Sequence, residues 1–311
     1  MTTKLSAKKS KKPKSKSSAT KKSRKPATTS KKTAKKASTP QAPKLPRLPK
    51  GGLKDIGLMS FGKKAVRKKR SKPSAGGVGI SLAGNVADRQ RAVDTRLSPF
   101  RKVCDLVITA ADNGLHSGTA FFISPRMLLT CGHCLFIFDP GTAAHGPVRK
   151  VLIMPARNGE TNPAQSLVGW VEVTTENMRV HDRWRLEGNL EFDYGVLILP
   201  PNQPLGSQVG SFNVSPFPDQ QLNGARPTLS GYPDNVPEGT QWFETNPIRQ
   251  VTPTRLFYDI FTFGGQSGSP VFFANNTQQT ACAIHNFGNV PFNSGVRITP
   301  AVIAQLNAWR V

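Results

Sequence analysis

The sequence lacks the segments that mark secretion or membrane insertion. No apolar stretch of about 7–15 residues follows Met1, so no secretory signal is expected. No run reaches the roughly 18 apolar residues of a membrane-spanning helix, so no membrane span is expected either. Cysteine is scarce, with four in 311 residues, which is too few for a disulfide framework. Their pairing state is left open by the sequence; they are Cys104, Cys131, Cys134 and Cys282.

Acidic residues are almost absent from the first 72 positions. Residues 1–72 hold 26 of the 43 lysine and arginine residues and one acid, Asp55, so they carry the whole formal net charge of +25. They also contain few apolar residues to bury, and we therefore expect a disordered tail. Residues 73–87, rich in glycine, alanine and serine, predict a linker or the junction of a pro-segment.

The lysine-rich tail predicts binding to a polyanion. Paired lysines such as Lys8-Lys9 and Lys31-Lys32 neutralise phosphates and release counterions, which gives salt-sensitive, sequence-independent attraction to nucleic acid. The tail resembles those of linker histones and the basic arms of viral capsid proteins, which favours a nucleus or a virion. A solubilising or targeting role is the alternative, and Arg67–Arg70 also fits a localisation signal or a processing site.

Long segments with helical periodicity are missing from the rest of the chain. From about Asp88 onward, apolar runs of about four to seven residues alternate with turns rich in proline, glycine and asparagine. This pattern is typical of an all-β sandwich or barrel. The exception is Pro300–Trp309, where apolar residues recur at helical spacing behind Thr299, so a C-terminal helix is predicted there.

A serine between glycines stands ahead of the apolar run Val271–Phe273. In Gly264–Pro270 the glycines allow the backbone to approach a substrate closely. The amides of Gly265 and Ser267 can then point at one spot beside the Ser267 hydroxyl, where an oxyanion would form. An ordinary loop rich in glycine and serine is the alternative interpretation.

Two upstream residues supply the partners that a nucleophilic serine requires. His133 follows the strand-like run Met127–Thr130, and Asp193 precedes the apolar run Gly195–Leu199. An acid placed before a buried strand needs a partner, and a histidine N–H is one. We therefore predict acyl transfer in which Ser267 attacks, His133 moves the proton and Asp193 orients the imidazole.

The segment Cys131-Gly132-His133-Cys134 matches the redox motif of disulfide isomerases. A redox site of that kind lies at the start of a helix in an α/β pattern, whereas the surroundings here are β. One Cys-x-x-Cys without a second pair of ligands does not predict a zinc site. We therefore expect neither a metal nor another cofactor.

The order histidine, aspartate, serine, with Thr-x-x-His-Cys and Gly-x-Ser-Gly-x-Pro motifs, resembles the chymotrypsin-like serine proteases. The closest resemblance is to the glutamyl endopeptidases of the staphylococcal type, and it spans residues 88–311 without the tail. It is carried by Asp88-Arg89, Val93–Thr95, Ser230–Pro233, Trp242, Tyr258–Phe272, Ala283–His285, Gly288 and Asn293–Val296. It implies a serine endopeptidase domain, expected to be monomeric, that acts on protein or peptide substrates. The implied fold is two antiparallel β-barrels, about 88–200 and 201–311, with the site in the cleft between them.

The resemblance also implies specificity. In that family a histidine and a threonine bind the glutamate side chain before the cut bond, and their positions fall on His285 and Thr262. An imidazole and a hydroxyl can donate charge-assisted hydrogen bonds to a carboxylate. A packed strand histidine and a plain strand threonine are the alternatives. We expect cleavage after glutamate, and more slowly after aspartate.

The chain departs from the resembled family in two ways. Trypsin-like relatives bridge the cysteine after the catalytic histidine to an upstream strand, but Ser117–Phe121 has none, so Cys134 is expected to be free, as suits a reducing compartment. The N-terminus of the family's mature enzymes aligns with a position near Leu82. With the tail attached, this chain has no free amine at that position. The tail is therefore a pro-segment or a retained anchor. The first glutamate in the chain is Glu160, so an enzyme that cleaves after glutamate could not readily remove its own tail. Removal of the tail would need another protease.

A function of another class stays open at this point. Alphavirus capsid proteins also place a lysine-rich arm before a chymotrypsin-like domain, which cuts itself free and then falls silent. The alternative is therefore a nucleic-acid-packaging or structural protein on a protease fold, with only self-cleaving or no activity.

Overall fold

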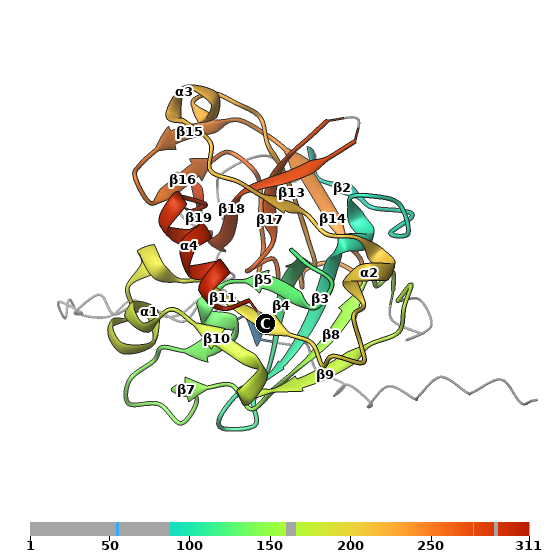
Figure 1. Cartoon of the computed structure of the whole chain (residues 1–311), viewed down its shortest axis with the longest axis vertical. Helices are drawn as coiled ribbons and strands as arrows, with labels where there is room; N and C mark the ends of the chain where they lie inside the picture. Colours follow the sequence, from blue (N-terminus) through green and yellow to red (C-terminus); the bar gives the residue numbers. More distant parts are fainter. Residues whose placement is uncertain (1–53, 56–87, 160–165, 276, 289–291, 311) are drawn as a thin grey trace, which may run out of the picture. The chain divides into compact units, whose positions relative to one another are not determined.

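The computed structural model describes residues 54–55, 88–159, 166–275, 277–288 and 292–310 (Figure 1). The linker and nearly all of the tail lie outside the described residues, so both remain predictions. Within the tail, β1 (Lys54–Asp55) is a short strand parallel to β4, with Lys54 opposite His116 and Asp55 opposite Ser117. None of the described helices has the length and apolar character needed to cross a membrane.

The first large sheet has the order β10-β11-β5-β4-β3-β8-β9, with every neighbouring pair on this path antiparallel. Its strands are rich in valine, leucine and isoleucine, and β3 is buried along nearly its whole length, as expected for a strand covered on both faces. The strands are β3 (Val103–Thr109), β4 (Leu115–Phe122), β5 (Met127–Thr130), β8 (Lys150–Pro155), β9 (Val171–Thr174), β10 (Met178–Val180) and β11 (Gly195–Ile198).

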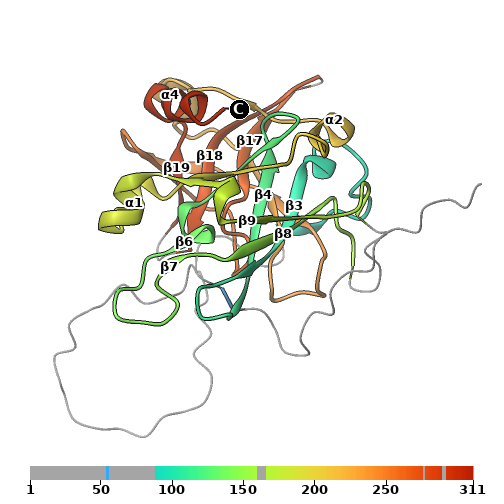
Figure 2. The ribbon, with the colours of Figure 1, turned by 60° about the horizontal axis from the view of Figure 1, so that its bottom comes forward.

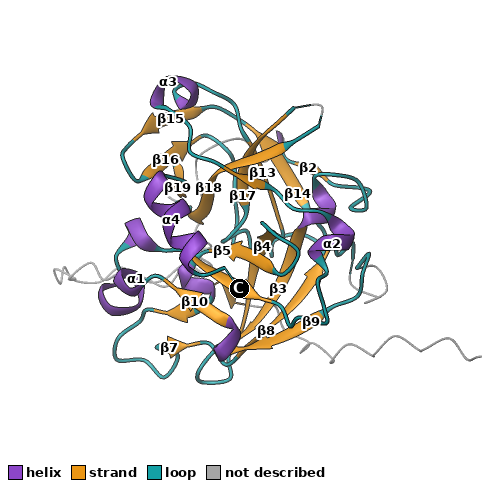
Figure 3. Ribbon diagram, in the orientation of Figure 1, coloured by secondary structure: helices purple, strands orange, loops and turns teal. Residues whose placement is uncertain are grey.

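The second large sheet has the order β15-β16-β19-β18-β17-β13-β14-β2, and β12 pairs with β18. Its strands are β2 (Gln90–Arg91), β12 (Asn213–Val214), β13 (Thr228–Gly231), β14 (Trp242–Thr245), β15 (Ile248–Val251), β16 (Arg255–Tyr258), β17 (Pro270–Ala274), β18 (Gln279–Phe287) and β19 (Asn293–Arg297). The predicted all-β architecture is confirmed, and Figure 3 shows how strands dominate it. The strand β2, from the predicted first barrel, pairs instead with β14 of the second sheet.

The C-terminal helix is also confirmed as α4 (Pro300–Ala308), and Figures 1 and 2 place it beside β18 and β19. The Thr299 hydroxyl accepts a hydrogen bond from the Val302 amide and so caps the first turn. The shorter elements are η3 (Phe100–Lys102), η4 (Gly132–Cys134), β6 (Phe136–Ile137), β7 (Gly146–Pro147), η6 (Thr175–Asn177), α1 (Asp182–Glu187), η7 (Leu190–Phe192), α2 (Gly206–Val209) and α3 (Asp219–Leu222).

One hydrophobic core joins the two sheets. The interior of the first sheet packs with Phe272, Ile284 and Val296 of the second, and with Leu306 of α4. Phe212 meets Phe272 at a ring-centroid distance of 5.1 Å in an edge-on contact. Because the two sheets share this core, the loops at their junction are held in fixed relative positions.

Candidate active site

His133 and Asp193 meet at adjacent strand ends. His133 lies in η4 directly after β5, and Asp193 precedes β11, which pairs with β5 so that Gly195 faces Thr130. One Asp193 oxygen accepts the His133 backbone N–H at 2.7 Å, and the other lies 2.7 Å from Nδ1. Since Asp193 is fully buried, this pairing satisfies a carboxylate that would otherwise be costly. It places the imidazole proton on Nδ1 and leaves a lone pair on Nε2.

Asn286 connects this pair to the serine. Its Nδ2 donates to the Asp193 side chain at 2.9 Å and to the Asp193 backbone carbonyl at 2.5 Å. The backbone carbonyl of Asn286 accepts a hydrogen bond from the Ser267 hydroxyl at 3.4 Å. Asn286 is not predicted from the sequence, where its only local signal is its place next to His285 in β18.

The Ser267 turn depends on two glycines with left-handed backbone conformations. Gly265 has a φ of 85° and Gly268 a φ of 89°. A Cβ on Gly268 would collide with the Thr119 carbonyl, so no other residue fits there. The Thr119 amide donates to the Ser267 carbonyl at 2.8 Å, and the Gly268 amide donates to the His285 carbonyl at 2.7 Å. The turn is therefore fixed to both sheets.

The two amides predicted to form the oxyanion hole have no competing acceptor. Across the described ranges, neither the Gly265 nor the Ser267 amide donates a hydrogen bond to another protein group. The Gln266 side chain accepts the Phe263 amide at 2.9 Å and braces the loop from inside. Neither the Gly265 nor the Ser267 amide is therefore engaged in a bond that a developing oxyanion would have to displace.

His285 and Thr262 are both buried in the second sheet and its neighbouring loop. The Tyr258 hydroxyl lies 2.7 Å from His285 Nδ1. Burial lowers the pKa of His285 to about 3, helped by His133 and Arg255, so the imidazole is neutral near pH 7. Burial also raises the pKa of Tyr258, which stays a phenol. If this phenol donates to Nδ1, the His285 proton sits on Nε2.

Glu244 supports the loop that carries Thr262. Its carboxylate accepts the Phe261 amide at 2.9 Å and a hydrogen bond from Asn246. Burial raises the pKa of Glu244 to about 7, although both hydrogen bonds and Arg89 oppose this shift. The Arg89 guanidinium lies 5.3 Å from the Phe261 ring. Glu244 was also missed by the sequence analysis, since an acid inside a strand-like run gives no signal of its loop partner.

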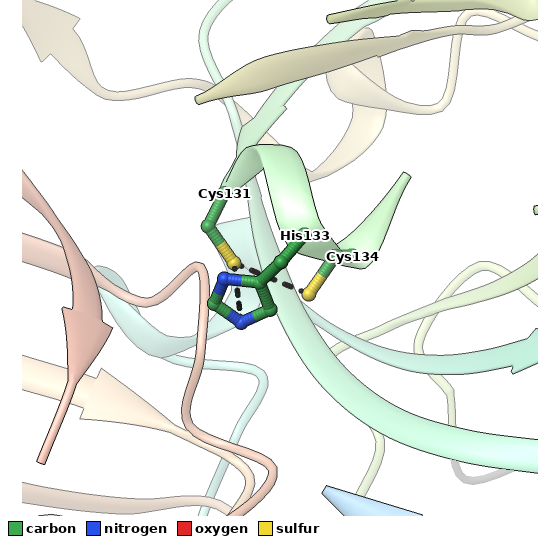
Figure 4. A group of neighbouring side chains, drawn as sticks. All are labelled: Cys131, His133 and Cys134. Atoms are coloured by element: carbon green, nitrogen blue, oxygen red, sulfur yellow. Dashed lines mark hydrogen bonds between the residues drawn. The ribbon is translucent and has the colours of Figure 1, made fainter. Parts of the chain in front are cut away.

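All four cysteines are buried and free, as was expected for Cys134. Cys131 Sγ lies 3.3 Å from His133 Nε2 and 3.2 Å from Cys134 Sγ (Figure 4). Cys134 Sγ is in turn 3.8 Å from the Ser267 carbonyl. The hydrogen bond from Cys131 lowers the pKa of Cys134, whereas burial raises the pKa of Cys131. The contact between the Cys131 thiol and the His133 imidazole is not predicted from the sequence.

Comparison with known proteins identifies the family. The trypsin-like peptidase domain matches residues 118–279. A glutamyl endopeptidase of Bacillus licheniformis is 32% identical over 232 residues, covering 72% of this chain and 67% of that protein. An extracellular metalloprotease of Bacillus subtilis is 30% identical over 224 residues, which cover 71% of this chain and 67% of that protein. A solved Glu endopeptidase superposes with a TM-score of 0.61 at 24% identity, covering 73% of this chain and 98% of that one.

The family match spans the His133, Asp193 and Ser267 neighbourhoods, and the solved relative has the same fold over nearly its whole length. The chain belongs to the trypsin-like peptidase family and is a serine endopeptidase of the glutamyl endopeptidase type.

Proposed function

We propose that the enzyme cleaves peptide bonds through an acyl-enzyme on Ser267. The Ser267 oxygen attacks the peptide carbonyl while His133 Nε2 takes its proton. The amides of Gly265 and Ser267 stabilise the oxyanion, and His133 then protonates the leaving amine as the C–N bond breaks. Water repeats the sequence to release the acid and restore the serine. The buried Asp193–His133 pair carries this proposal, since it prepares the tautomer that general-base catalysis needs.

In this structure the Ser267 hydroxyl donates to the Asn286 carbonyl at 3.4 Å, near the long limit of a hydrogen bond. Attack requires the hydroxyl to turn toward His133 Nε2. The cost is small, because a long hydrogen bond is given up for another bond between two neutral groups. Catalytic hydrogen bonds commonly tighten only when substrate is bound.

We further propose a preference for glutamate before the cut bond. A neutral His285 that accepts from Tyr258 at Nδ1 carries its proton on Nε2, where a substrate carboxylate would replace the Ser294 backbone carbonyl as the acceptor. The buried Thr262 hydroxyl offers a second donor. Two donors in a buried site suit one carboxylate group. Glutamate reaches one methylene further than aspartate, so aspartate is expected to react more slowly.

A fluorogenic peptide panel that varies only the residue before the cut tests both proposals. We expect the full chain to cleave after glutamate, and Ser267→Ala to lose this activity by several orders of magnitude. Ser211→Ala, a change in a loop outside the site, is the matched control and should behave as wild type. Equal cleavage by Ser267→Ala would contradict the nucleophile. Faster cleavage after lysine or leucine would contradict the specificity.

The lysine-rich tail supports a second proposal, that residues 1–72 bind nucleic acid or another polyanion and hold the protease on it. This rests on charge alone. The competing function, a packaging protein that cuts only itself, predicts no repeated turnover in the peptide panel. Sustained turnover by the full chain would therefore separate the two functions.

A further inference from the structure

Three potential metal ligands converge beside the active-site histidine. Cys131 Sγ, Cys134 Sγ and a ring nitrogen of His133 all lie within 4.8 Å of one another, and all three residues are buried. All three side chains come from one turn of the chain. Cys131 is the N-cap of η4, and His133 and Cys134 belong to η4. Figure 4 shows the sulfur of Cys131 beside both the imidazole and the sulfur of Cys134.

Two of the three ligand separations are close to those around a tetrahedral cation. Zinc–sulfur bonds of about 2.3 Å place two sulfurs roughly 3.8 Å apart, and a sulfur and a nitrogen roughly 3.6 Å apart. The observed separations from Cys131 Sγ are 3.2 Å to Cys134 Sγ and 3.3 Å to His133 Nε2. Side-chain rotations that move these atoms apart by a few tenths of an ångström close the two differences. The third separation, between Cys134 Sγ and a ring nitrogen of His133, is no more than 4.8 Å. Two thiolates and one imidazole form a recognised zinc ligand set, with the fourth position open.

Asp193 holds the imidazole of this cluster as a carboxylate commonly holds a histidine that binds a metal. A histidine that binds a metal commonly donates its other ring N–H to a carboxylate, which fixes the tautomer. Asp193 takes that place, 2.7 Å from His133 Nδ1, and is itself held by Asn286. The lone pair on Nε2 faces the Cys131 sulfur, so the tautomer required for catalysis is also the one required for ligation.

We propose that Cys131, His133 and Cys134 bind a thiophilic divalent cation of the zinc class, and that this cation reversibly inhibits the protease. Binding forms two metal–sulfur bonds and one metal–nitrogen bond, and releases the two thiol protons to solvent. The His133 lone pair is then occupied and cannot take the Ser267 proton. Inhibition rests on the proposed catalytic role of His133, whereas binding does not.

Cobalt titration of the full-length Ser267→Ala variant tests binding without requiring activity. With a non-thiol reductant present, we expect one Co²⁺ per chain and a near-ultraviolet thiolate-to-cobalt absorption. The variant carrying Cys131→Ala and Cys134→Ala should lose this band. The matched control carries Cys104→Ala and Cys282→Ala, which removes two buried cysteines elsewhere, and should keep it. Asp193→Asn should weaken binding about 10- to 100-fold. No band in the parent, or the same band without Cys131 and Cys134, would overturn the site.

Inhibition is measured separately as the ratio of peptidase activity in buffered Zn²⁺ to activity in chelator, taken within each Ser267-containing protein. We expect the ratio to fall at least tenfold for the wild type and for the Cys104/Cys282 control, and to stay near one without Cys131 and Cys134. Equal inhibition in all three would place the inhibitory cation elsewhere. An inactive wild type that still binds cobalt would contradict the proposed function but would still support the metal site.

Discussion

Asn286 makes the most consequential single-residue contact that the motifs do not reveal. Asn286→Ala removes the amide that donates to Asp193 at 2.9 Å, so a buried carboxylate oxygen loses a partner. Such a loss costs about 1–3 kcal/mol, which corresponds to roughly 5- to 150-fold in rate when it acts on the transition state. We expect kcat to fall within this range with little change in KM, as measured by steady-state peptide hydrolysis.

The exposed Asn223 supplies the control for that experiment. Asn223→Ala should leave kcat unchanged. A rise in KM alone for Asn286→Ala would show that Asn286 acts on substrate binding, and would contradict its role in positioning Asp193.

A second prediction for a single residue concerns Tyr258 and the proposed preference for glutamate. Tyr258→Phe keeps the ring but removes the hydroxyl that lies 2.7 Å from His285 Nδ1. His285 can then carry its proton on either nitrogen, and its donor toward a glutamate carboxylate is no longer fixed. We expect kcat/KM for glutamate peptides to fall about tenfold, a loss near 1.4 kcal/mol. Cleavage of leucine peptides is the internal control, and an equal loss on both would show a general structural defect.

Among the elements, β14 and the loop after β16 are coupled through Glu244. Its raised pKa, about 7 against an ordinary 4.5, means that the native protein retains a proton that the unfolded chain has released. The free energy of unfolding should therefore decrease as pH rises from about 4.5 to 7. Glu244→Gln keeps an acceptor for the Phe261 amide without the buried charge. The Glu244→Gln variant should therefore show a weaker decrease of the free energy of unfolding with pH. At pH 8 its free energy of unfolding should exceed that of the wild type by on the order of 2 kcal/mol.

Urea unfolding of both proteins at several pH values measures this effect. Glu187→Gln, at an exposed glutamate ending α1, is the control and should leave the wild-type slope intact. A parallel pH dependence of wild type and Glu244→Gln would refute the assignment to Glu244.

Local sequence patterns predict the elements well because strands and caps are coded locally. Met127–Thr130 and Pro270–Phe273 are short apolar runs, and both lie in strands. Pairing over long distances has no such signal: Gln90–Arg91 joins β14 in the second sheet. Asn286 and Glu244 escaped prediction for the same reason, since their partners are set by how strands and loops pack. Motif order predicts the candidate triad residues, and two of them, His133 and Asp193, are in contact. The thiol contact of His133 depends on the η4 turn, which the motifs do not reveal.

At the scale of the whole molecule, charge is divided between two parts of the chain. The formal net charge of +25 resides in residues 1–72, whereas the peptidase part is neutral overall. The strand β1 brings Lys54–Asp55 of the tail to β4, which also carries Thr119, a donor to the Ser267 carbonyl. Residues 54–55 therefore lie alongside the strand that contacts the Ser267 turn.

Replacing Lys8, Lys9, Lys11 and Lys12 with glutamine in the full chain tests the tail. Each lysine that contacts a phosphate of duplex DNA adds about 0.9 to the slope of log affinity against log salt. We expect the slope to fall by up to about 3–4 and low-salt affinity to fall with it, as measured by fluorescence anisotropy. Peptide cleavage should stay unchanged, because these lysines lie far in sequence from the site. Lys150→Gln, an exposed lysine of the neutral part, is the control. A slope that is equal in wild type and tail variant would place nucleic-acid binding outside these four lysines.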